Sequence, residues 1–114
     1  MTKVRIADAN QLADGQTVKF TFKRGNRPAE GFLARFAGQL VAYENVCRHI
    51  AISLDYGDDR FFSRDGKHFI CQSHGALYEP LTGLCVAGPC AGESLKPLKI
   101  AVKEGSVWLV FESA

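Results

Sequence analysis

The sequence lacks a long apolar run and a strong excess of charge of either sign. No stretch approaches the ~18 consecutive apolar residues of a membrane-spanning helix. The first residues, 1–8, lack the apolar core of a secretory signal peptide. The 14 Lys and Arg side chains exceed the 12 Asp and Glu by only two and form no basic run. We therefore expect a cytoplasmic protein that binds neither membranes nor nucleic acid.

Helical periodicity is also lacking. No run of about eleven residues has a convincing helical pattern of apolar side chains. In the first third of the chain, short runs instead alternate apolar and polar residues between turn residues, which is typical of strands. The expected strands are 16–23, 30–36, 39–45, 94–103 and 107–111. With 114 residues, the chain is long enough for one all-β domain.

Turn signals connect these strands. Ala37-Gly38 and Glu104-Gly105 separate consecutive strands near each end of the chain. Asp65-Gly66 predicts a tight hairpin between 60–63 and 67–71, because both central residues of such a turn take positive φ. We expect a single domain, with a β base domain of residues 1–45 and 93–114 and a loop-rich subdomain of residues 46–92 inserted into it.

All four cysteines lie in the inserted segment. In a chain without an export signal, cysteines are more often metal ligands or thiols than disulfides. Cys47-Arg-His49 is followed after 21 residues by Cys71-Gln-Ser-His74, so each of two short motifs pairs one cysteine with one histidine. Two cysteines and two histidines are the ligands of a Rieske 2Fe-2S centre. A structural zinc site is the nearest alternative, although its ligand spacings usually differ from these.

Three further side chains have the chemistry of ligands but fall outside these motifs. Cys85 and Cys90 could form a disulfide or act as additional ligands, although small buried thiols are the expected interpretation. His68 lies on the predicted hairpin strand that leads to Cys71, and we expect an exposed side chain there rather than a ligand. The predicted metal and cofactor ligands are therefore Cys47, His49, Cys71 and His74, and no catalytic residue is predicted.

Three motifs give the chain a family resemblance: Cys47-Arg-His49, the segment Cys71 to Tyr78, and Gly88-Pro-Cys-Ala-Gly92. On these residues the chain resembles the Rieske ferredoxins that supply electrons to bacterial ring-hydroxylating oxygenases. The resemblance implies three antiparallel sheets, a cluster-binding subdomain inserted in a β base domain, and one 2Fe-2S cluster with cysteines on the inner iron and histidines on the outer one. It also implies a non-enzymatic one-electron carrier between a flavin-dependent reductase and a terminal oxygenase, monomeric or weakly oligomeric. The alternative is a Rieske-like small subunit of a larger oxidoreductase such as nitrite reductase.

Departures from the Rieske proteins of cytochrome bc complexes indicate which branch the chain resembles. Ile52 and Ser73 stand where those proteins have the two cysteines of a disulfide between the ligand loops. Ala76 stands where they have a serine that bonds a bridging sulfide, whereas Tyr78 matches a tyrosine that bonds a ligand cysteine. These differences imply the low-potential, soluble branch of the family.

Overall fold

The computed structural model describes residues 2–8, 10, 12–24, 26–46, 54, 61–71 and 75–111. The described residues form nine strands and no helix, which confirms the predicted all-β class. The strands are β1 (Thr2–Asp8), β2 (Thr17–Arg24), β3 (Arg27–Phe36), β4 (Gln39–Glu44), β5 (Phe69–Ile70), β6 (Leu77–Tyr78), β7 (Cys85–Ala87), β8 (Ile100–Lys103) and β9 (Ser106–Phe111). Within this part of the chain, no helix is present that could cross a membrane.

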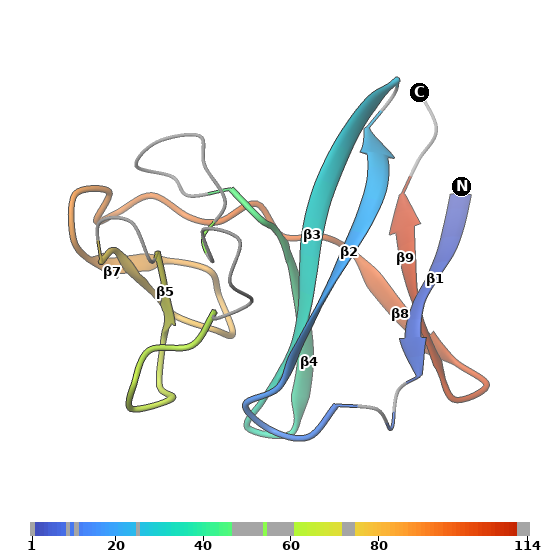
Figure 1. Cartoon of the computed structure of the whole chain (residues 1–114), viewed down its shortest axis with the longest axis horizontal. Coiled ribbons are helices and arrows are strands. Elements are labelled where there is room, and N and C mark those ends of the chain that lie inside the picture. The colour runs from blue at the N-terminus through green and yellow to red at the C-terminus, as the bar shows by residue number, and fades with distance from the viewer. Residues whose placement is uncertain are drawn as a thin grey trace.

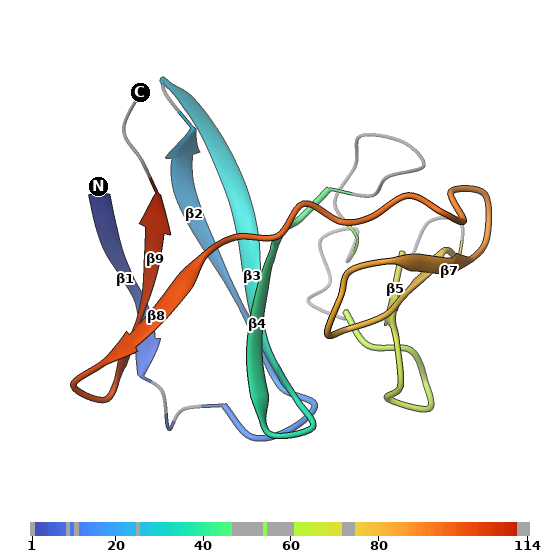
Figure 2. The same ribbon diagram turned by 180° about the vertical axis from the view of Figure 1, so that it is seen from behind.

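The strands form three antiparallel sheets of three strands each, with the orders β1-β9-β8, β2-β3-β4 and β5-β6-β7. The β2-β3-β4 sheet lies in the middle (Figure 1). The β1-β9-β8 sheet, which contains the first and last strands, lies on one side of it, and the short β5-β6-β7 sheet lies on the other (Figure 2). The short sheet therefore lies at one end of the molecule.

The middle sheet separates two hydrophobic clusters because successive side chains of a strand point to opposite faces. Phe32, paired with Tyr43, belongs to the cluster on the side of the short sheet. Leu33, paired with Ala42, belongs to the cluster shared with the β1-β9-β8 sheet. Phe32 and Leu33 are both fully buried. One strand thus supplies both cores and fixes the short sheet relative to the base.

Two of the three predicted turns are two-residue hairpins with both central residues at positive φ. Ala37 and Gly38 have φ of 50° and 80°, and Glu104 and Gly105 have φ of 54° and 75°. These values are those of type I′ turns, whose twist matches that of the flanking strands. Both turns confirm the sequence prediction.

The Asp65-Gly66 prediction is wrong in its detail. Gly66 has a φ of 72°, but Asp65 is not in the positive region, and the Ser63 N–H donates to the His68 carbonyl at 2.7 Å across a wider loop. The Asp65 carboxylate accepts bonds from the Ser63 hydroxyl at 2.6 Å and the Lys67 N–H at 3.0 Å. These two bonds lower the pKa of Asp65, with the Ser63 hydroxyl as the larger cause. The aspartate therefore stabilises the loop through its side chain.

The predicted strand 94–103 is also shorter than expected, because β8 begins at Ile100. Pro97 has no N–H for a regular ladder and forms an isolated bridge with Tyr43. On either side of it, the Lys96 carbonyl accepts from the Glu44 N–H and the Leu98 N–H donates to the Ala42 carbonyl, both at 2.9 Å. This segment therefore runs along β4 and connects the short sheet to the base.

Candidate metal centre

The structure places one of the four predicted ligands. Cys71 directly follows β5 and is fully buried. Cys47, His49 and His74 lie outside the described residues. Elsewhere in the described ranges, no group of three or more His, Cys, Asp or Glu side chains is positioned to hold a metal ion. The four-residue ligand set therefore stays a prediction, which the described residues around the two motifs support.

The ends of the second motif are fixed by the backbone. The Cys71 N–H donates to the Ala76 carbonyl at 2.9 Å, and the Gly75 N–H donates to the Cys71 carbonyl at 2.8 Å. Gly75 has a φ of 75°, a conformation that glycine adopts without the steric cost of a Cβ atom. The segment that contains His74 therefore starts and ends at one place, as a Cys-x-x-His chelating loop requires.

The ends of the first motif are joined by a side chain. Asn45, at the end of β4, is the buried polar side chain of the described core, at 3% exposure. Its Oδ1 accepts a hydrogen bond from the Leu54 N–H at 2.9 Å, and its Nδ2 donates to Glu30 Oε1 at 2.6 Å. Asn45 thus links the two ends of the segment that carries Cys47 and His49. Sequence reasoning missed this residue.

The glycine- and proline-containing segment after β7 packs against the second motif. Gly88 has a φ of 100°, and a Cβ atom there would lie 2.8 Å from the Cα of Ala76. Only glycine fits so close to another backbone. Gly75 differs, because its absent Cβ has no described atom within 4 Å and its positive φ alone favours glycine. The segment 88–92 is therefore in contact with the second motif.

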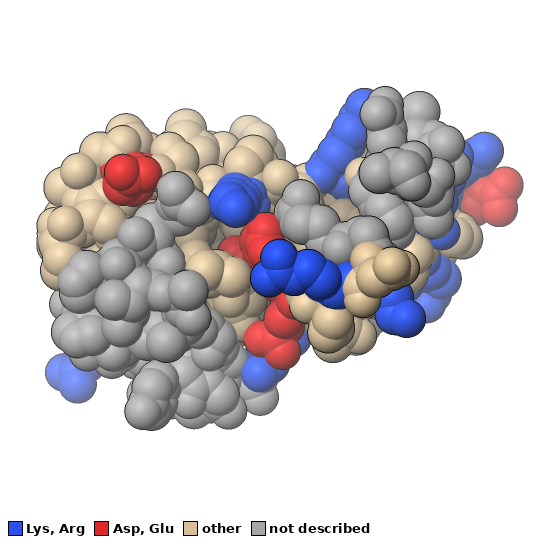
Figure 3. Space-filling model, turned by 90° about the horizontal axis from the view of Figure 1, so that it is seen from above, with Lys and Arg blue, Asp and Glu red and all other residues tan. Residues whose placement is uncertain are grey.

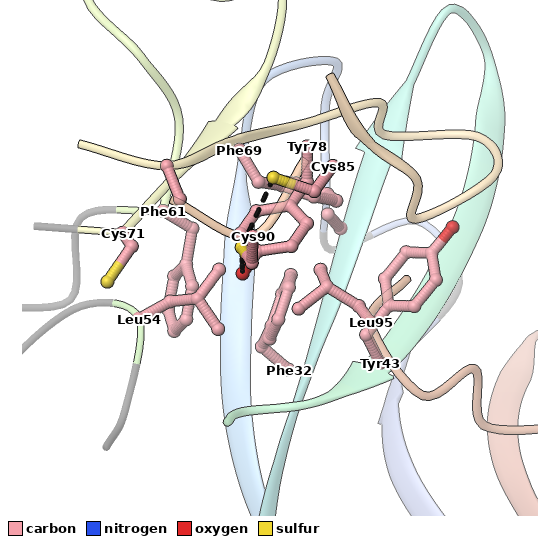
Figure 4. Close-up of a cluster of buried hydrophobic side chains, with 12 residues drawn as sticks. Phe32, Tyr43, Leu54, Phe61, Phe69, Cys71, Tyr78, Cys85, Cys90 and Leu95 are labelled. Atoms are coloured by element: carbon pink, nitrogen blue, oxygen red, sulfur yellow. Dashed lines mark hydrogen bonds between the residues drawn. The ribbon is translucent and has the colours of Figure 1, made fainter. Parts of the chain in front are cut away.

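An aromatic cluster forms the base of this region. Phe32 stacks on Phe61 with 4.3 Å between ring centroids and meets Phe69 edge-on at 5.0 Å. Cys71 lies at the margin of the cluster with its sulfur directed away from Tyr78 and Cys90 (Figure 4). A buried thiol beside an apolar wall, between segments whose ends are fixed, fits the thiolate ligand of an iron-sulfur cluster.

Four other side chains considered in the sequence analysis lie near this region. The Tyr78 hydroxyl lies 3.1 Å from Cys90 Sγ, while the expected bond from Tyr78 to a ligand cysteine stays a prediction. Cys85 and Cys90 are buried, as expected. The His68 side chain is 26% exposed, and its Nε2 lies 3.6 Å from Glu79 Oε1.

Comparisons with known proteins agree on one family. The family model of the Rieske [2Fe-2S] domain matches residues 2–104. Ferredoxin CarAc of Metapseudomonas resinovorans is 33% identical over 111 residues, which cover 96% of this chain and 94% of that protein. The structure of the ferredoxin of carbazole 1,9a-dioxygenase from Nocardioides aromaticivorans IC177 is 24% identical and superposes with a TM-score of 0.72 over 98% of this chain and all of that one. A ferredoxin-sized chain in a structure of reduced oxygenase with oxidised ferredoxin of carbazole 1,9a-dioxygenase is 25% identical, with a TM-score of 0.72 over 94% of this chain and all of that one.

Proposed function

Because the chain belongs to the Rieske [2Fe-2S] domain family, we propose that it passes single electrons from a flavin-dependent reductase to a terminal oxygenase through a cluster held by Cys47, His49, Cys71 and His74. It is a ferredoxin with one Rieske 2Fe-2S cluster, and it is an electron carrier rather than an enzyme. The observation that carries the proposal is its 33% identity to a ferredoxin over nearly the whole of both chains.

The chemistry of the predicted ligands fits this role. Cys47 and Cys71 would bind the inner iron as thiolates, and His49 and His74 would bind the outer iron as neutral imidazoles. When bound, the cluster accepts and releases one electron, and two imidazoles in place of two thiolates make it easier to reduce than an all-cysteine cluster. Asn45 joins the ends of the first ligand segment, Gly88 lets the segment after β7 pack on the second motif, and the aromatic wall around Phe32 would keep water from the cluster. Such a rigid, dry environment limits the reorganisation that accompanies electron transfer.

We further propose a base domain of residues 1–45 and 93–114 and a cluster-binding subdomain of residues 46–92. Strands β5 to β7 all fall within 46–92, whereas the strands of the other two sheets fall outside it. The two parts share the cluster around Phe32. We therefore expect the subdomain to depend on the base for its order.

The proposed partners are other redox proteins. The solved structures similar to this chain include an oxygenase in complex with a ferredoxin, which supports a terminal oxygenase as the electron acceptor. Basic and acidic side chains lie side by side over the middle of the face in Figure 3, in agreement with the small net charge of the chain. Such a mixed surface fits a cytoplasmic carrier that binds neither nucleic acid nor membranes. A carrier must leave each partner between turnovers, so we expect a monomer or weak oligomer with an interface below about 1,200 Å².

Anaerobic stopped-flow mixing tests the direction of electron flow. Protein reduced by one electron is mixed with the oxidised terminal oxygenase of carbazole 1,9a-dioxygenase, and the cluster absorption is followed. We expect reoxidation that saturates with oxygenase concentration, because transfer occurs within a specific complex. Ferricyanide serves as the control acceptor for a competent cluster. A protein that reduces ferricyanide but none of a panel of such oxygenases would contradict the proposed acceptor.

Gel filtration during purification from the native host distinguishes the carrier from the nitrite reductase-like alternative. A carrier elutes alone, at the size of a small monomer or weak oligomer. Elution only as a stoichiometric complex with a catalytic chain would identify a subunit of a larger oxidoreductase.

A further inference from the structure

The proposed ligand set leaves two cysteines without a role, and the structure brings them together. Cys85 is the first residue of β7, and Cys90 follows Gly88-Pro89 in the turn beyond it. Both are reduced and buried, with 2% and 6% exposure. The Cys90 Sγ lies 3.2 Å from the Cys85 Sγ, inside the cluster shown in Figure 4. This distance between the two sulfur atoms is shorter than an ordinary van der Waals contact between them.

The backbone holds the two cysteines in this relation. The Cys85 N–H donates to the Glu93 carbonyl at 2.7 Å, and the Gly92 N–H donates to the Cys85 carbonyl at 3.0 Å. The Glu93 N–H donates in turn to the Cys90 carbonyl at 2.9 Å. Cys85 is thus paired with the far end of the segment in which Cys90 lies. Because the fold already fixes both ends, little chain entropy remains to be lost when the sulfurs join.

The two sulfurs differ in hydrogen bonding and in exposure. The Cys90 S–H donates to Cys85 Sγ, and the Cys85 S–H donates to the Ala87 carbonyl at 3.2 Å. The Tyr78 hydroxyl lies 3.1 Å from Cys90 Sγ. Cys90, at 6% exposure against 2% for Cys85, is the sulfur nearer the surface and is therefore assigned as the attacking thiol.

We propose that Cys85 and Cys90 form a redox-active dithiol that is converted to an intrachain disulfide by low-molecular-weight disulfides. The Cys90 thiolate attacks one sulfur of the oxidant, whose S–S bond breaks, and one small thiol leaves with the proton of Cys90. Cys85 then attacks the Cys90 sulfur of the mixed disulfide, and the second small thiol leaves with the proton of Cys85. Two electrons pass from the protein thiols to the oxidant, and none passes through the iron-sulfur site. The proposal is thus independent of the proposed electron transfer.

The cross-link would join β7 to the turn that packs on the second motif. Gly88 lies between the two cysteines and against Ala76, so a disulfide restricts the segment that covers this part of the predicted metal centre. Oxidation of the pair would therefore make that segment more rigid, and reduction would reverse the change.

Glutathione redox buffers test the proposal on the cluster-loaded protein. The protein is equilibrated anaerobically from both the reduced and the oxidised side at increasing fractions of oxidised glutathione, and its thiols are alkylated in denaturant. Cleavage after Tyr78 by chymotrypsin and after Glu93 by a glutamate-specific protease releases residues 79–93, which contain Cys85 and Cys90 and no other cysteine. We expect this fragment to escape alkylation and to be lighter by two hydrogen atoms, while the cluster absorption is unchanged. The folded protein should form the disulfide at least about tenfold more favourably than the denatured chain in the same buffer.

Single substitutions test the order of attack. Cys85→Ser should accumulate a glutathione adduct on Cys90, because the resolving thiol is absent. Cys90→Ser should leave Cys85 unmodified, because Cys85 is the more buried sulfur. A wild-type fragment that remains a dithiol in oxidised glutathione, that stops at the mixed disulfide, or that cyclises no better than the denatured chain would overturn the proposal.

Discussion

At the scale of single residues, the account depends on side chains that hold the ligand segments without binding metal. Asn45 is the clearest, because its amide bonds Leu54 on one side and Glu30 on the other. The sequence predicts Cys47, His49, Cys71 and His74 from their spacing and residue type. It gives no comparable signal for Asn45, because the partners of this amide lie nine and fifteen residues away and are brought to it only by the fold.

Asn45→Ala should destabilise the protein by about 1–3 kcal/mol, because it leaves the Leu54 N–H without its acceptor in a buried place. The substitution should also lower the iron content of the purified protein, because the ends of the first ligand segment are no longer joined. Urea unfolding and iron analysis measure the two effects. Gln39→Ala, which removes an exposed amide from β4, is the control and should change stability by no more than about 0.5 kcal/mol. Equal effects of the two substitutions would refute the role given to Asn45.

At the scale of elements, the longer strands are predictable and the shortest ones are not. Strand β2 appears where apolar and polar residues alternate, whereas β3, β4 and β9 contain short apolar runs between turn residues. Alternation is also present in β1, where Val4 and Ile6 alternate with Lys3 and Arg5, although no strand is predicted there. Strands β6 and β7 have two and three residues, too few for any period to show. Their places are set by contacts with the middle sheet rather than by local pattern.

The contact between Gly88 and the second motif can be tested by comparing two glycines of similar backbone conformation. Gly88 and Gly92 have φ of 100° and 95°, but a Cβ atom at Gly92 would meet nothing within 4 Å. Alanine at either place should cost about 1–2 kcal/mol because of the positive φ. Gly88→Ala should cost a further ~1–3 kcal/mol, because its Cβ overlaps the Ala76 backbone. Thermal unfolding measures both, and an equal loss at the two positions would show that the close approach is unimportant.

Tyr43 connects the middle sheet to the turn between β6 and β7. Its buried hydroxyl donates to the Pro80 carbonyl at 2.8 Å, and burial raises its pKa to about 12. Because the unfolded chain ionises this phenol near pH 10, the folded protein binds more protons between about pH 10 and 12. The stabilisation from Tyr43 is therefore complete below about pH 10 and is lost as the pH rises toward 12.

Tyr43→Phe should reduce stability at neutral pH by about 0.5–1.5 kcal/mol through loss of the hydrogen bond to Pro80. The difference between the wild type and this variant should shrink as the pH rises above about 10, because only the wild type carries the buried phenol. Urea unfolding from pH 8 to about 11 follows both curves. A difference that stays constant over this range would contradict the assigned role of burial.

At the scale of the whole molecule, the short β5-β6-β7 sheet lies at one end of a base made of the other two sheets. From the loop-rich segment that contains every candidate ligand, the sequence predicts a subdomain of residues 46–92, and its bounds stay a prediction. It could not predict how the segment 94–99 runs along β4, because Pro97 interrupts the strand pattern and the pairing depends on tertiary contact.

The surroundings of the cluster should set a midpoint potential toward the low end of the Rieske range, which runs from about −150 to +300 mV. Hydrogen bonds to the cluster sulfurs stabilise the reduced state, and Ala76 has no hydroxyl to donate one. We expect Ala76→Ser to raise the potential and Tyr78→Phe to lower it in protein-film voltammetry at neutral pH. Leu81→Ser, at an exposed position in the turn before β7, is the control and should leave the potential unchanged. A wild-type potential near the positive end of the range would refute this explanation.

The central claim is that two histidines and two cysteines hold the cluster, and pulsed EPR of the reduced protein tests it most directly. The protein is prepared with ¹⁵N-labelled histidine and reduced by one electron, and its nitrogen couplings are compared with those of the unlabelled protein. The account predicts two strongly coupled nitrogens whose couplings change with the isotope, and their loss when His49 or His74 is substituted. A paramagnetic 2Fe-2S cluster without histidine nitrogen, as expected if Cys85 and Cys90 completed an all-cysteine ligand set, would contradict it.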